Sequence, residues 1–215
     1  MTGRLYLSGL TLAGDRGSDA LLGDFVRVHK LVCAGLGCGR AEAQALHYTE
    51  PERSRILVQS ATRPDWETPE VVRFARVRQQ AVKDIASFHN RLGLGDKLSV
   101  RLVAVPGKKN AKVNAGRLQP AETHDEALRW LERKLLSAAV LLEIGAEKLP
   151  VRSAENKAVD PYGVNPDHRP RITLSPWEYR GLIEITDPEE FRRSVRIGLG
   201  PGKAYGFGMI RFAYT

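Results

Sequence analysis

Residues 198–208 are Gly-Leu-Gly-Pro-Gly-Lys-Ala-Tyr-Gly-Phe-Gly, with five glycines spaced around the single lysine Lys203. Glycine has no Cβ, so such a segment can turn tightly and bring backbone N–H groups close to phosphate oxygens. The same freedom would also let two half-sheets pack tightly together, and a purely structural role for the glycines stays open. The stretch therefore predicts either a phosphate-binding loop or a tight junction between structural units.

Two glycine-rich nucleotide-binding motifs do not fit this stretch. A P-loop requires glycine at the position of Ile197 and serine or threonine at the position of Ala204. A Rossmann fingerprint opens a helix, whereas this stretch follows a predicted helix and opens the last predicted strand, 205–212. Nucleotide-dependent chemistry is therefore not expected.

The sequence before this stretch has the pattern of one α+β unit. The run Asp-Pro-Glu-Glu at 187–190 has helix-start chemistry and predicts a helix that ends at Gly198. A capping box at 123–126 precedes apolar residues at helical spacing. Strands are expected at 98–105, 140–144, 172–174, 179–186 and 205–212.

The first half of the chain has a similar order of elements. A helix is expected to begin after its N-cap Asp24 and to end near Gly35, and Thr68-Pro69-Glu70 predicts the start of a second helix. Strands are expected at 4–12, 44–48 and 55–61, and a further strand at 82–88, although residues 71–82 could also continue as helix.

Two tandem ferredoxin-like units of the βαββαβ kind account for this repeated order better than one large sheet. The expected fold class is therefore α+β, with an N-terminal domain at 1–93, a C-terminal domain at 97–215 and a junction near 93–96. Residues 152–171, which are rich in Pro, Asn and charge, are expected to form a flexible insertion in the second unit.

The composition favours a polyanionic partner. The chain of 215 residues contains 33 Lys and Arg against 25 Asp and Glu, a formal net charge of +8. Residues 97–121 carry lysines and arginines without any acid, which favours phosphate binding, although a solvated loop without a partner stays open. No apolar run approaches the ~20 residues that cross a bilayer, and residues 1–12 do not resemble a signal peptide. A cytoplasmic protein with no membrane partner is expected.

The cysteines do not indicate a metal site. Cys33 and Cys38 are the only two, and a zinc site would need further Cys or His ligands at matching spacing. Cys33 is expected to be a small buried residue on a helix. No metal and no cofactor are expected.

The glycine-rich run at 198–209 resembles the C-terminal loop of the CasE family, the endoribonucleases that process precursor CRISPR RNA in type I-E systems. The loop alone is similar to that of the wider RAMP superfamily, so the order of several segments is what points to CasE. The segments that resemble the family are 57–60 leading to 64–66, 98–106 with the lysines that follow, 130–135 and 179–185. The resemblance spans nearly the whole chain.

This resemblance implies the RRM-like RAMP fold, with two ferredoxin-like domains that grip a CRISPR repeat RNA hairpin on a basic face. Family members cut at the 3′ side of the stem without a metal. The adjacent 2′-OH attacks, leaving a 2′,3′-cyclic phosphate and a 5′-OH. The resemblance also implies that the enzyme keeps its product and joins the other subunits of the type I-E surveillance complex.

The family's catalytic histidine lies on the first helix, and the matching segment 24–29 makes His29 its counterpart. From its spacing alone, His29 flanks the apolar stripe and could either project into a groove or be a partly buried, satisfied imidazole. We expect His29 to transfer a proton to or from the ribose oxygens, while Lys203 and the N–H groups of Gly200 and Gly202 stabilise the phosphorane. The residues expected to contact RNA are Arg27, Lys30, Lys108, Lys109, Lys112, Arg152, Lys157, Arg169 and Arg171.

One departure from the family pattern lies beside this histidine. Some members carry a tyrosine three residues before it, where this chain has Val26, so a neighbouring hydroxyl is absent. Arg27, Lys30 or a residue from elsewhere could take over its role. A hairpin-binding subunit that never cuts RNA therefore stays open. A protein-interaction subunit whose basic face binds RNA only non-specifically is a separate alternative. His47, His89, His124 and His168 are expected to be ordinary surface or loop residues.

Overall fold

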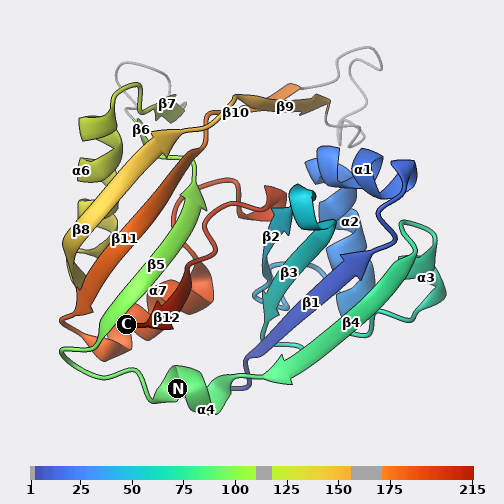
Figure 1. The fold of residues 1–215 in the computed structure, drawn as a ribbon, viewed down its shortest axis with the longest axis horizontal. Helices are drawn as coiled ribbons and strands as arrows, with labels where there is room; N and C mark the ends of the chain where they lie inside the picture. Colours follow the sequence, from blue (N-terminus) through green and yellow to red (C-terminus); the bar gives the residue numbers. More distant parts are fainter. Residues whose placement is uncertain (1–2, 110–117, 156–170) are drawn as a thin grey trace.

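The structure, a computed structural model, describes residues 3–109, 118–155 and 171–215, and two antiparallel four-stranded sheets occupy its two halves (Figure 1). The N-terminal sheet has the order β2-β3-β1-β4 and the C-terminal sheet the order β12-β5-β11-β8. In both, the first strand of the unit lies between its third and fourth strands, which is the βαββαβ arrangement. The predicted α+β fold with two ferredoxin-like units is therefore confirmed, while the domain limits 1–93 and 97–215 stay a prediction. The strands are β1 (Tyr6–Leu12), β2 (Leu46–Glu50), β3 (Arg55–Ser60), β4 (Val77–Asp84), β5 (Lys97–Ala104), β8 (Ala139–Lys148), β11 (Trp177–Ile185) and β12 (Arg211–Tyr214).

Helix α2 (Phe25–Leu36) covers the N-terminal sheet and carries His29. The carboxylate of Asp24 accepts hydrogen bonds from the N–H groups of Val26 and Arg27, each at 3.0 Å, so the predicted N-cap is confirmed. The structure adds a helix that the sequence did not predict, α1 (Arg16–Gly23), which Asp15 caps. The remaining short elements of this unit are η1 (Pro51–Arg53), α3 (Pro69–Val72) and α4 (Ala86–Asn90).

Two helices cover one face of the C-terminal sheet. In α6 (His124–Leu135) the predicted capping box is present, and Asp187 caps α7 (Pro188–Ile197). Trp130 of α6 and Phe191 of α7 belong to one buried apolar cluster with the strands. Two hairpins extend this unit, β6 (Gly107–Lys109) with β7 (Leu118–Pro120) and β9 (Arg152–Glu155) with β10 (Arg171–Leu174), and a short helix η2 (Lys203–Tyr205) lies in the glycine-rich stretch.

Two strand predictions were wrong in position. The strand expected at 82–88 is β4, which ends at Asp84 because its pairing with β1 sets its limits, and the next residues form α4. The last strand begins at Arg211 rather than 205, because Gly206 and Gly208 have φ values of +88° and interrupt extended backbone. In the insertion expected to be flexible, the ends pair as β9 and β10, and residues 156–170 lie outside the described part of the chain.

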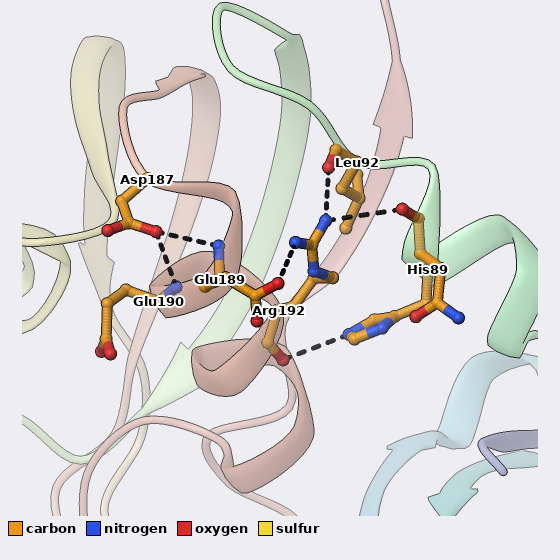
Figure 2. A network of polar contacts seen from close by, with 7 residues as sticks. His89, Leu92, Asp187, Glu189, Glu190 and Arg192 are labelled. Carbon is orange, nitrogen blue, oxygen red and sulfur yellow. Dashed lines mark hydrogen bonds and ion pairs between the residues drawn. The ribbon is translucent and has the colours of Figure 1, made fainter. Parts of the chain in front are cut away.

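Helix α7 also joins the two units through its backbone carbonyl groups. Gln59 of β3 donates a buried hydrogen bond of 2.8 Å to the carbonyl of Val195. Figure 2 shows the other end of the junction, where the His89 ring lies 3.1 Å from the Arg192 carbonyl and the Arg192 guanidinium donates to the carbonyl of Leu92. His89 was expected to be a surface or loop residue, and this expectation was wrong. Its ring points from α4 into the junction, and the residue is 1% exposed.

The buried contact of Gln59 predicts the strength of this junction. We expect Gln59→Ala to lower the free energy of unfolding by about 1–3 kcal/mol, because it leaves the Val195 carbonyl without a partner. Urea unfolding followed by circular dichroism measures the change. Gln79→Ala, at an exposed position on β4, is the matched control and should shift the value by less than ~0.5 kcal/mol. Equal losses in the two variants would show that the junction does not depend on this bond.

Candidate active site

His29 lies in the second turn of α2, on the side that faces the glycine-rich stretch. Its ring nitrogens are 3.8 and 3.9 Å from the Cys33 sulfur one turn later, and its ring centroid is 6.5 Å from that of Tyr205. The side chain is half-buried, and this burial, with Arg40 nearby, lowers the pKa of His29. The ring is therefore mostly neutral at pH 7 and can accept a proton.

The glycine-rich stretch is a closed loop that packs against both units. The N–H of Leu199 donates to the carbonyl of Gly208 at 2.9 Å, and the N–H of Gly208 donates to Val103 of β5 at 2.7 Å. A Cβ on Gly208 would lie 2.3 Å from the Leu199 oxygen, and a Cβ on Gly198 would lie 2.9 Å from Leu46 of β2. The packing alone thus requires these glycines, and the phosphate-binding role of the Gly200 and Gly202 N–H groups stays a prediction.

His47 of β2 lies beneath this loop. It is 1% exposed, and a Cβ on Gly206 would be 3.4 Å from its Nε2 atom. Neither ring nitrogen has a hydrogen-bond partner in the described part of the chain. Burial, followed by the charges of His29 and Arg40, lowers the pKa of His47 to about 3. The expectation of a surface residue was wrong here, because the loop from the other unit covers the end of β2.

Positive charges from both units gather around Lys203, and one of them, Arg40, also acts on His29. Burial lowers the pKa of Lys203, and the charges of Arg40 and Lys134 lower it further. Arg40 follows α2, and its guanidinium donates to the Ala45 carbonyl at 3.2 Å, which holds the side chain in place. Within the described residues, every charge that shifts His29 or Lys203 is positive. Such an uncompensated cluster is suited to an anion, and a phosphodiester is the anion that RNA offers.

A groove of about 600 Å³ adjoins the cluster on the helical side of the C-terminal unit. Lys203 and Lys134 of α6 line it, together with Arg193 of α7, whose guanidinium forms an ion pair of 3.5 Å with Glu190, another lining residue. Sequence reasoning did not select Lys134 or Arg193, because basic residues on the exposed side of a helix are ordinary. It also passed over Arg40, which follows the end of α2 without any periodic pattern.

The residues expected to contact RNA are spread over three places. Arg27 and Lys30 are exposed on α2, the helix that carries His29, and Lys108 is exposed on β6, the strand that also contains Lys109. Arg152 and Arg171 belong to the hairpin β9–β10, which extends across the top of Figure 1 toward α1. Lys112, Lys157, Arg169 and also His168 lie outside the described residues. The structure thus places Arg27 and Lys30 on the helix that carries His29, and Lys108, Arg152 and Arg171 on elements of the C-terminal unit.

In the ranges 3–109, 118–155 and 171–215, no group of three or more His, Cys, Asp or Glu side chains could hold a metal ion. Cys33 is only partly buried, contrary to expectation, because it faces His29 rather than the core, and Cys38 is also a free thiol. No described helix has the length and apolar character needed to cross a membrane.

The duplicated sheets and the glycine-rich loop between them define a protein of the RAMP class. Within that class, the chain belongs to the family described as CRISPR associated protein, whose model matches residues 5–213. The predicted resemblance is confirmed by a relative, the CRISPR-associated endoribonuclease Cse3 of Thermus thermophilus. It is 29% identical over 160 residues, which cover 74% of this chain and 72% of the relative.

Solved structures agree with this assignment. Thermus thermophilus Cse3 bound to an RNA that represents a pre-cleavage complex has a TM-score of 0.74 at 27% identity, covering 98% of this chain and 99% of that one. Cas6e from Escherichia coli K-12 has a TM-score of 0.65 at 21% identity, covering 98% and 100%. At that lower identity, the second match supports the fold only.

The charge cluster predicts the titration of His29. We expect Arg40→Gln to raise the pKa of His29, because removing a neighbouring positive charge makes protonation of the ring easier. NMR titration of the His29 ring protons measures the shift. Arg40→Lys keeps the charge and should keep the lowered value, and an unchanged His29 titration in Arg40→Gln would show that burial acts alone.

The buried His47 predicts sensitivity to acid. In the unfolded chain His47 binds a proton near pH 6.5, whereas in the folded chain its pKa is about 3. The contribution of neutral His47 to the free energy of unfolding is therefore fully present above pH 6.5 and is lost as the pH falls. Between pH 7 and pH 5 this one group should remove about 2 kcal/mol. Urea unfolding at both values should show a correspondingly smaller loss for His47→Leu than for the wild type. The exposed control His124→Leu should behave as the wild type, and a His47→Leu variant with the same loss would contradict the account.

Proposed function

We propose that this protein is an endoribonuclease that binds the hairpin of a CRISPR repeat in precursor CRISPR RNA. It cuts at the 3′ base of the stem without a metal ion. The observation that carries the proposal is a half-buried histidine of lowered pKa near Arg40, whose charge also acts on Lys203 of the other unit. Family membership and the RNA-bound Cse3 structure support the same activity.

In the proposed reaction, the 2′-oxygen of the ribose attacks the adjacent phosphorus and the bond to the 5′-oxygen breaks. His29, neutral at pH 7, takes the proton from the 2′-hydroxyl, and a proton from water or from the protonated ring reaches the leaving 5′-oxygen. The positive charges of Lys203 and Arg40 stabilise the negative charge that grows on the phosphorane, with the N–H groups of Gly200 and Gly202 as further donors. The products are a 2′,3′-cyclic phosphate and a 5′-hydroxyl.

The hairpin stem would lie on the basic residues around this site. Arg27 and Lys30 of α2 would contact the strand near the cut, and Lys134 would hold a phosphate along the groove. Arg193 would have to exchange its ion pair with Glu190 for a phosphate. Contacts to phosphates fit an A-form stem, whose deep major groove is closed to side chains. We further propose that the protein works in the cytoplasm, keeps its product and serves as a subunit of the type I-E surveillance complex.

A second candidate function is a subunit that holds the hairpin and does not cut it. It is favoured by Val26, which leaves the position three residues before His29 without a hydroxyl. The two functions differ only in the chemistry at His29, so one experiment separates them.

Cleavage of the host's repeat hairpin in EDTA tests the proposal. His29→Ala should cut at least ~100-fold more slowly than the wild type, because the proton acceptor is gone, while its affinity for the hairpin stays within a few-fold. The rate is followed on gels, and an RNA with a 2′-deoxy residue at the cut position should remain intact. The exposed His124→Ala is the control and should cut normally. Tight binding by the wild type without any cutting would establish the second candidate instead.

A further inference from the structure

Tyr205 of η2 lies against the face of α2 that carries His29. Its ring centroid is 5.0 Å from that of Phe25 and 6.5 Å from that of His29, with interplanar angles of 63° and 71°. Phe25 and His29 are four residues apart and therefore neighbours on one face of the helix. The Tyr205 ring thus spans both residues, although it comes from the other unit and from a segment far away in the sequence.

The body of this side chain is held in place. The Tyr205 N–H donates to the Gly202 carbonyl at 2.8 Å, and the side chain packs against the apolar cluster that contains Phe207 and Val105. Edge-to-face aromatic pairs such as that with Phe25 prefer this separation and angle. The direction of the ring is therefore set before any substrate arrives.

The hydroxyl of Tyr205, in contrast, is free. Tyr179 donates to the Ala127 carbonyl and Tyr214 donates to Asp96, whereas the Tyr205 hydroxyl has no hydrogen-bond partner in the described part of the chain. The residue is only partly buried, so its hydroxyl can meet a ligand. A phenolic hydroxyl is a good donor to a phosphate oxygen.

We propose that the Tyr205 hydroxyl donates a hydrogen bond to a non-bridging oxygen of the scissile phosphate, which makes Tyr205 a second catalytic residue. The inference rests on the proposed endoribonuclease function. With ring centroids 6.5 Å apart, a phosphodiester that touches the His29 imidazole also lies within reach of the phenol. Val26 is apolar and cannot supply this donor from α2 itself, so the loop supplies it from the other unit.

Removal of the hydroxyl alone tests this role. In single-turnover cleavage with saturating protein, Tyr205→Phe should cut the repeat hairpin about 100-fold more slowly, the size expected for one lost donor to a developing oxyanion. The dissociation constant for the hairpin should change by less than about twofold, because the ring still packs on Phe25. Tyr214→Phe removes a hydroxyl away from the site and is the matched control, with an unchanged rate.

A rescue distinguishes a missing donor from a disturbed loop. Adding Val26→Tyr to Tyr205→Phe places a new hydroxyl one turn before His29, and this double variant should recover most of the lost rate. A Tyr205→Phe variant that cuts as fast as the wild type, or one that loses affinity in proportion to rate, would overturn the inference. In both cases wild-type cutting would leave the endoribonuclease proposal standing. A wild type that leaves the RNA intact would instead remove that proposal and this inference together.

Discussion

The close approach of two backbone segments within residues 198–208 is the constraint on which the rest of the structure depends. Gly208 and Leu199 lie so near each other that a single Cβ would overlap a carbonyl oxygen. A Cβ on Gly198 would lie 2.8 Å from the Gly208 oxygen and 2.9 Å from a side-chain carbon of Leu46. The hydrogen bond from Gly208 to Val103 then fixes this loop to the C-terminal sheet. Because Leu46 belongs to the N-terminal sheet, the same few glycines join the units and bring Tyr205 to His29.

Helix α7, which precedes this loop, contacts both units. Its apolar residues, including Phe191 and Val195, belong to the C-terminal core, while its carbonyl groups accept hydrogen bonds from Gln59 and His89 of the other unit. A helix is stiff over this length, so the position of the loop that follows it is tied to both cores. The distance between His29 and the loop is thus a property of the junction and not of either unit alone.

The sequence predicted several features that depend on neighbouring residues, although it missed α1 with its cap Asp15, and it missed features that depend on distant residues. The caps at Asp24 and Asp187 were found because an acidic side chain bonds N–H groups two or three residues later. The limits of β4 were misplaced because they follow from pairing with β1. His47 gave no sign of burial, since the segment that covers it comes from the end of the chain. His29 itself was found through the family resemblance, whereas spacing left its role open.

The electrostatics of the site favour cleavage of RNA over binding without cleavage. A protein that only binds RNA gains most from fully charged, exposed lysines and arginines, because the attraction to phosphate grows with charge. Burial of His29 works against that, since it lowers the pKa of the ring and leaves it mostly uncharged at pH 7. Proton transfer, by contrast, requires a neutral imidazole at the phosphate, and an excess of fixed positive charge stabilises the phosphorane more than the singly charged diester. The burial is therefore unfavourable for affinity and favourable for the transition state, which is the distribution of free energy that a catalyst needs.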